Sequence, residues 1–174
     1  MFFKTRKINS QIGSECFYCL SIEPDGRTKD VLLSQVEALS TLVGREHTDM
    51  FGSPGIRLLG LPLVQSDRNK FLEVLKKELA HSGPLKVEVG SKYLDQQRGV
   101  IGLTCDINPQ FARVFGQLSS SLRNSLPDGI NYLKRSYNFH VVLLRNLSPG
   151  LFDFLNQGFN WTRPLEFTVN ELVV

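Results

Sequence analysis

The sequence lacks the features that would assign the chain to a membrane or to a nucleic-acid scaffold. No apolar run approaches the ~18 residues that a membrane-spanning helix requires. The first seven residues include Phe2 and Phe3 but no apolar core of a secretory signal. The net charge is only +3 over 174 residues, far from the lysine and arginine stripe of a dedicated nucleic-acid binder. These absences predict a globular cytoplasmic protein with no membrane partner.

Cysteine is also scarce, with three residues in the chain, as is typical of proteins in a reducing compartment. Cys16 and Cys19 have the C-x-x-C spacing, but they lie in a predicted strand, where positions three apart point to opposite faces. Redox and zinc pairs of this spacing occur at turns or helix starts, where the two sulfurs converge. Cys105 stands alone downstream. The sequence therefore predicts no metal site and no cofactor.

The chain does contain one succession of elements, strand, helix, strand, helix and strand, which occurs twice. Hydrophobic residues make up 41% of the chain, enough for a substantial core. Apolar periodicity predicts, in the first half, strands over 17–22, 56–59 and 84–89 and helices over 32–43 and 71–79. In the second half it predicts strands over 100–105, 137–146 and 164–169 and helices over 111–122 and 151–159. We expect Pro62 to end its strand, and the polar stretch 91–98 to join the halves.

This repeat predicts a single domain, residues 1–174, made of two pseudo-symmetric lobes over about 14–90 and 99–174. The expected fold class is α+β, with duplicated βαβαβ halves, two-lobed antiparallel sheets, helices outside and a central cleft. A cleft between related halves is the natural place for a ligand.

The stretch 137–146 is the most β-prone run of the chain. In a strand, His140, Val142 and Leu144 share one face, and Arg145 lies on the other. His140 is either a half-buried structural histidine or a residue that lines a groove. Matching 58–59 with 143–144 makes Gly55 the equivalent of His140, at an offset of 85 residues, whereas a register without a gap would pair His140 with Gly60.

The segment His140-Val141-Val142-Leu143-Leu144-Arg145 and the duplicated order together resemble the two-histidine (2H) phosphoesterase superfamily, in particular its 2′-5′ RNA ligase and cyclic phosphodiesterase branch. The resemblance implies one H-x-[ST] motif in each half. One histidine would act as general base and the other as general acid, and the two hydroxyls would hold the phosphate. The chain departs from this pattern in three positions. Val142 replaces the second hydroxyl, Gly55 the first histidine and Arg57 the first hydroxyl.

Two functional hypotheses follow from the resemblance. In the first, the chain is a non-catalytic descendant, and it binds a nucleotide, an RNA end or a protein partner. His140 and Arg57 would contact an anionic ligand, with Gly55, Val142 and Arg145 as further candidate binding residues. For Arg57, a solvated position or a salt bridge to a neighbouring strand is the more ordinary arrangement, and for Arg145, on the opposite face, a structural anchor is. In the second, the chain is an active cyclic phosphodiesterase that uses His140 with His47, a loop histidine, as the second catalyst.

Overall fold

The structure of the chain is a computed structural model, which describes residues 2–4, 11–12, 15–48, 54–80, 83–126, 139–162, 164–169 and 171–173. Its strands are β1 Phe2–Lys4, β2 Gln11–Ile12, β3 Glu15–Ile22, β4 Ile56–Val64, β5 Leu85–Asp95, β6 Val100–Ile107, β7 His140–Leu144, β8 Leu165–Val169 and β9 Glu171–Val173. Its helices are α1 Gly26–Val43, α2 Arg68–Leu79, α3 Pro109–Ser125 and α4 Pro149–Gly158, with short 3-10 turns η1 Arg45–His47 and η2 Gln65–Asp67.

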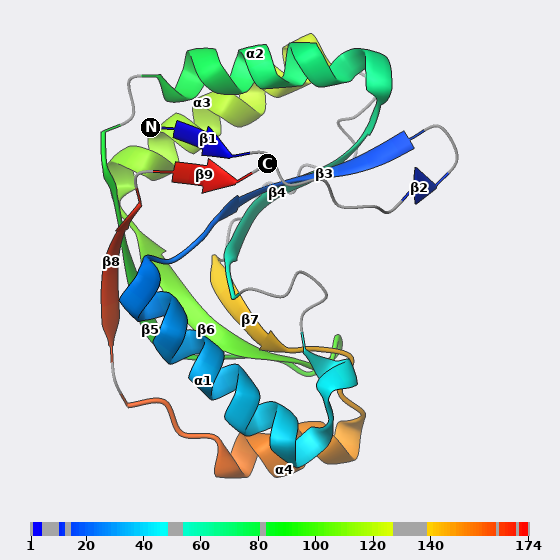
Figure 1. Ribbon diagram of the computed structural model, residues 1–174, viewed down its shortest axis with the longest axis vertical. Coiled ribbons are helices and arrows are strands. Elements are labelled where there is room, and N and C mark those ends of the chain that lie inside the picture. The colour runs from blue at the N-terminus through cyan, green and yellow to red at the C-terminus, as the bar shows by residue number, and fades with distance from the viewer. Residues whose placement is uncertain are drawn as a thin grey trace.

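The strands form one curved sheet in the order β1-β9-β3-β4-β7-β6-β5-β8, with β2 paired to β3. Neighbouring strands are antiparallel except for the parallel pair β1 and β9. Helices α2 and α3 lie at one end of the sheet, and α1 and α4 lie at the other (Figure 1). The expected α+β class with helices outside the sheet is confirmed. Both halves of the chain contribute strands to this one sheet, whereas their origin by duplication stays a prediction.

Two predicted interruptions, at Pro62 and at 91–98, are wrong. Strand β4 continues through Pro62, which pairs with Phe17 of β3. Strand β4 pairs with β7 at Ile56, at the other end of β4. Pro62, which has no backbone N–H, therefore does not have to donate a hydrogen bond to a second neighbouring strand. The polar stretch 91–98 is not a separate joint, because β5 continues to Asp95 and pairs with β6 in a hairpin. The hairpin turns at Gly99, whose φ of 58° favours glycine.

The helix ends follow local chemistry. The side chain of Asp25 accepts a 2.9 Å hydrogen bond from the backbone N–H of Thr28 at the start of α1. Gly44, with a φ of 102°, ends α1 as the sequence predicts. At the end of α4, the Nζ of Lys92 from β5 donates to the carbonyl oxygens of Asn156 at 2.7 Å and Phe159 at 3.2 Å. This lysine therefore ties α4 to the sheet.

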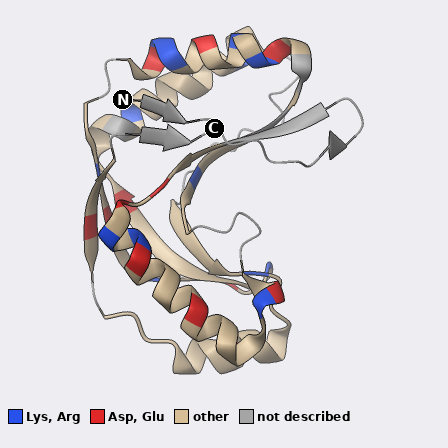
Figure 2. Cartoon of the chain, viewed as in Figure 1, with Lys and Arg blue, Asp and Glu red and all other residues tan. Residues whose placement is uncertain are grey.

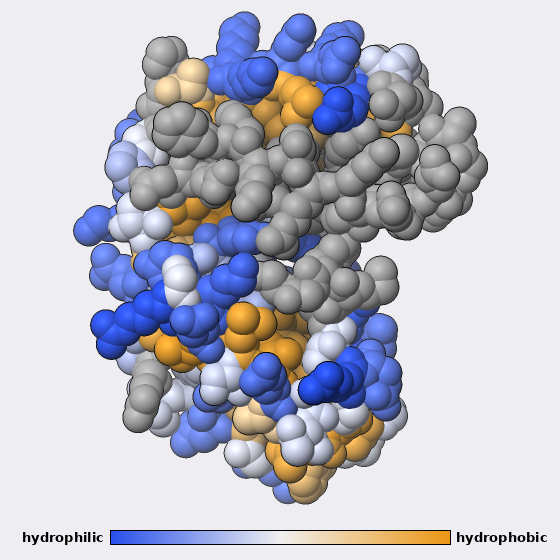
Figure 3. Space-filling view, in the orientation of Figure 1, coloured by the Kyte–Doolittle hydropathy of each residue, from blue (hydrophilic) through white to orange (hydrophobic). Residues whose placement is uncertain are grey.

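Apolar side chains between the sheet and the helices form the core. Its fully buried members include Ile22, Leu32, Ile56, Phe71, Leu103, Phe115, Val141 and Leu143. Charged residues gather on α1 and α2, whereas the central strands carry few of them (Figure 2). The outer surface of α2 is hydrophilic, and apolar atoms are visible at the opposite end near α4 (Figure 3), where Phe154 is exposed. Among the described residues, no helix combines the length and apolar character needed to cross a membrane.

Candidate functional site

The central strands bring four polar side chains into one line across the sheet. Ser21 of β3 pairs with Arg57 of β4, and Thr104 of β6 pairs with His140 of β7. The two pairs are joined by the antiparallel pairing of Ile56 with Val141. Arg57 and His140 are the next residues on either side of this pair, so the antiparallel register puts them opposite each other. We call the line of Ser21, Arg57, His140 and Thr104 the polar row.

All four side chains of the polar row point to the same face, since residues directly opposite each other in an antiparallel sheet share a side. The residues next to them in sequence point to the other face and are buried, as shown by Ile22, Ile56, Val141 and Cys105. Arg57 is exposed, whereas Ser21, His140 and Thr104 are half-buried. The row therefore lies on the accessible face of the sheet, away from the core beneath.

At the Thr104 end of the polar row, hydrogen bonds extend to the neighbouring strand β5. The Oγ1 of Thr104 donates to the carbonyl oxygen of Ser91 at 3.1 Å, and it lies 3.3 Å from the Oγ of Ser91. Gly90 leaves room for this contact, because a Cβ there would lie only 3.1 Å from the same Oγ1. The hydroxyls of Thr104 and Ser91 are thus held beside the histidine position of the row.

His140 is held from both sides of the sheet. On the accessible face, the ring of Tyr93 from β5 stacks on its imidazole, with the centroids 4.0 Å apart and an interplanar angle of 14°. On the core face, the preceding residue Phe139 meets Phe115 of α3 edge to face, at 6.0 Å between centroids. The carbonyl oxygen of Phe139 also accepts a 2.9 Å hydrogen bond from the N–H of Cys105. These contacts fix the entrance of β7.

Gly55 and Val142 lie next to the polar row. The same register puts Gly55 opposite Val142 on the face that carries Arg57 and His140. Ile56 and Val141, the residues between these positions, pair with each other and are 85 residues apart, which is the offset that makes Gly55 the equivalent of His140. Four of the six predicted site residues, namely Gly55, Arg57, His140 and Val142, therefore come together in one place.

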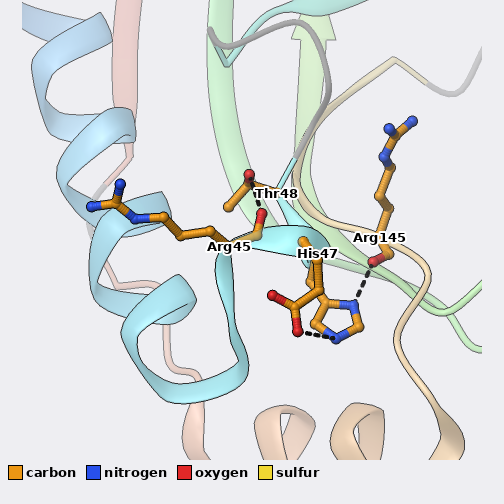
Figure 4. A network of polar contacts seen from close by, with 5 residues as sticks. Arg45, His47, Thr48 and Arg145 are labelled. Carbon is orange, nitrogen blue, oxygen red and sulfur yellow. Dashed lines mark hydrogen bonds and ion pairs between the residues drawn. The ribbon is translucent and has the colours of Figure 1, made fainter.

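His47 and Arg145 lie elsewhere. The chain around His47 meets the far end of β7, where Thr48 bridges to Leu144, four residues beyond His140 and about 13 Å along the strand. The N–H of Arg145 donates to the carbonyl oxygen of His47 at 2.8 Å, and the Nδ1 of His47 lies 3.3 Å from the carbonyl oxygen of Arg145. The imidazole of His47 points to this carbonyl and to the neighbouring glutamate, Glu46, whereas the guanidinium of Arg145 extends away (Figure 4).

This geometry does not bring His47 and His140 together as an acid and base pair. A pair of that kind must reach the same substrate atoms within hydrogen-bond distance. The side chain of His47 is 16% exposed and is occupied at the η1 contact. Its observed role is to join the segment after α1 to the end of β7.

All three cysteines lie in strands of the sheet. The Cys16 and Cys19 positions lie in β3, as predicted. Burial raises the pKa of the Cys105 thiol to about 12, so that this group stays protonated at neutral pH. In the part of the chain that the structure describes, no group of three or more His, Cys, Asp or Glu residues could hold a metal ion.

Comparison with known proteins assigns no family. No protein-family model matches the chain, and no curated protein matches it.

Sequence reasoning missed Ser21, Thr104 and Tyr93 as neighbours of the site. Each of these residues belongs to a different strand from His140, and only the pairing of strands brings them to it. Alternation within a strand tells which face a residue occupies, but it does not tell which residue lies opposite.

Proposed function

We propose that the chain binds a phosphate-bearing ligand, a nucleotide or an RNA end, on the polar row and does not hydrolyse it. The observation that carries this proposal is the pairing of Ile56 with Val141, which brings the neighbouring residues Arg57 and His140 together on two central strands. A guanidinium offers forked donors that match phosphate oxygens, and an imidazole beside it supplies another donor. The hydroxyl of Ser21 lies on the same row and can add a further hydrogen bond.

The non-catalytic part of the proposal rests on what lies around His140. Hydrolysis by the 2H type of chemistry needs a second proton-transfer group across the phosphate. The equivalent position is Gly55, which carries no side chain, and Val142 has no hydroxyl. Loss of one partner of such a pair lowers the rate by about 10²- to 10⁴-fold. The remaining groups suit binding better than turnover.

Binding is tested by titrating the protein with adenosine 3′-monophosphate, with adenosine as the ligand that lacks the phosphate. We expect Arg57→Ala to weaken binding of the nucleotide by about 10- to 100-fold, because charged hydrogen bonds contribute about 1.5–3 kcal/mol. Arg98→Ala is the matched control, since Arg98 is 64% exposed and lies beside Asp95 at the β5–β6 turn. No binding by the wild type, or equal loss in both variants, would contradict the proposal.

Catalysis is tested by incubating the protein with a 2′,3′-cyclic nucleotide and looking for the ring-opened monophosphate. We expect no product from the wild type. The informative pair of variants is His140→Ala and His47→Ala, since His47 lies at the other end of β7. Turnover that His140→Ala abolishes would refute the non-catalytic proposal. Turnover that is abolished by His140→Ala and also by His47→Ala would favour the active phosphodiesterase with two catalytic histidines.

A further inference from the structure

The stack of Tyr93 on His140 joins two strands that are not neighbours. Tyr93 is on β5 and His140 is on β7, with β6 between them. Strands are about 4.8 Å apart, so the two backbones are separated by about 10 Å. The ring centroids are nevertheless only 4.0 Å apart, which requires both side chains to lean across β6.

Strand β6 leaves space for this crossing. In the row that contains Tyr93, β6 contributes Gly102, and β7 contributes Val142. Gly102 has no side chain that could stand between Tyr93 and the imidazole. In the next row, the hydroxyl of Thr104 is directed toward Ser91 on β5, to which it is hydrogen-bonded.

The stack restricts the imidazole of His140 in a specific way. With the rings inclined by only 14°, Tyr93 covers one whole face of the imidazole. The ring edge carries both nitrogen atoms, so polar contacts of the imidazole are made along this edge. Tilting the imidazole out of this plane would break the stack, so the plane that contains its nitrogen atoms is coupled to the position of Tyr93.

We infer that Tyr93 is a positioning residue, which fixes the orientation of the imidazole of His140 beside the ligand that Arg57 binds. This inference rests on the proposed function and adds to it a residue that no sequence motif indicates. Tyr93 acts through its aromatic face, so phenylalanine should replace it and an aliphatic side chain should not. Preorganisation of a side chain improves affinity because less rotamer entropy is lost on binding.

The test compares Tyr93→Leu with Tyr93→Phe, and it uses nuclear magnetic resonance of the imidazole protons in the free protein as well as binding of adenosine 3′-monophosphate. The chain has three histidines, and His140→Gln assigns the signals of His140. A stacked ring shifts protons above its face upfield. We expect Tyr93→Leu to move the His140 signals downfield and to weaken binding by about 2- to 10-fold. Tyr93→Phe should preserve both properties.

Leu94→Ala is the control for a general disturbance of β5, because Leu94 follows Tyr93 and points to the other face. It should leave the His140 signals and the affinity unchanged. Unchanged His140 signals in Tyr93→Leu would overturn the inference. Shifted His140 signals in Tyr93→Leu with an unchanged affinity for the nucleotide would also overturn it. In that case Arg57→Ala would still test the proposed function separately. If the wild type binds no nucleotide, the proposed function fails and the positioning role fails with it, whatever the resonance signals show.

Discussion

A side chain added at Gly102 would meet the backbone of β7. A Cβ placed there would clash with the carbonyl oxygen of Val141 and would lie 3.2 Å from its carbonyl carbon. A backbone atom within a paired strand cannot turn away as a flexible side chain can, so β6 or β7 must shift. We therefore expect Gly102→Ala to lower the free energy of unfolding by about 2–3 kcal/mol, in the upper range for overpacked cores.

The matched control is Gly116→Ala in α3. Nothing lies within 4 Å of a Cβ added at Gly116. Alanine is favoured over glycine inside a helix by about 1 kcal/mol, so this variant should be more stable than the wild type. The two alanine variants should thus differ by about 3–4 kcal/mol, although each adds the same single methyl group.

Urea unfolding followed by circular dichroism measures this difference. With a slope of about 2 kcal/mol per molar urea, the midpoints of the two variants should lie about 1.5–2 M apart. A midpoint of Gly102→Ala equal to that of the wild type would refute the reasoning, because β6 and β7 could not then approach each other as closely as the structure has them. A shift of β7 would also move His140, so Gly102→Ala should weaken nucleotide binding as well.

Three further predictions concern Lys92 and Cys105, which lie outside the polar row. Lys92→Met should lower the free energy of unfolding by about 1–3 kcal/mol, because two carbonyl oxygens at the end of α4 lose their hydrogen-bond donor. The control is Lys86→Met on the same strand, where 68% of the side chain is exposed, and it should have little effect in the same urea assay. In a chain with Cys16→Ser and Cys19→Ser, Cys105 should react with a thiol reagent at pH 8 only after unfolding, and rapid modification of the native chain would contradict its burial. Desolvation by burial raises the pKa of this thiol from 9.0 to about 12, so the unfolded chain ionises first. Stability should therefore fall as the pH rises from 9 toward 12, and Cys105→Ala should remove this part of the decline in urea midpoints.

Apolar periodicity located the central elements of this chain without a structure. The stripe of Leu32 and Leu39 lies in α1, and the run from His140 to Leu144 forms β7. Local capping chemistry placed the end of α1 at Gly44. Periodicity failed where pairing overrides local preference, as in β4, which extends past Pro62, and in β5, whose polar second half is held by β6.

The candidate site divides in the same way. The sequence by itself indicated that Arg57 lies on one strand, with Gly55 just before it, and that His140 and Val142 lie on another. It also indicated which of these residues share a face, because alternation along a strand is a local property. Only the tertiary structure decided that Arg57 lies opposite His140, that Tyr93 covers the imidazole and that His47 lies at the far end of β7. These facts depend on strand order and register, which are set by the packing of residues far apart in the chain.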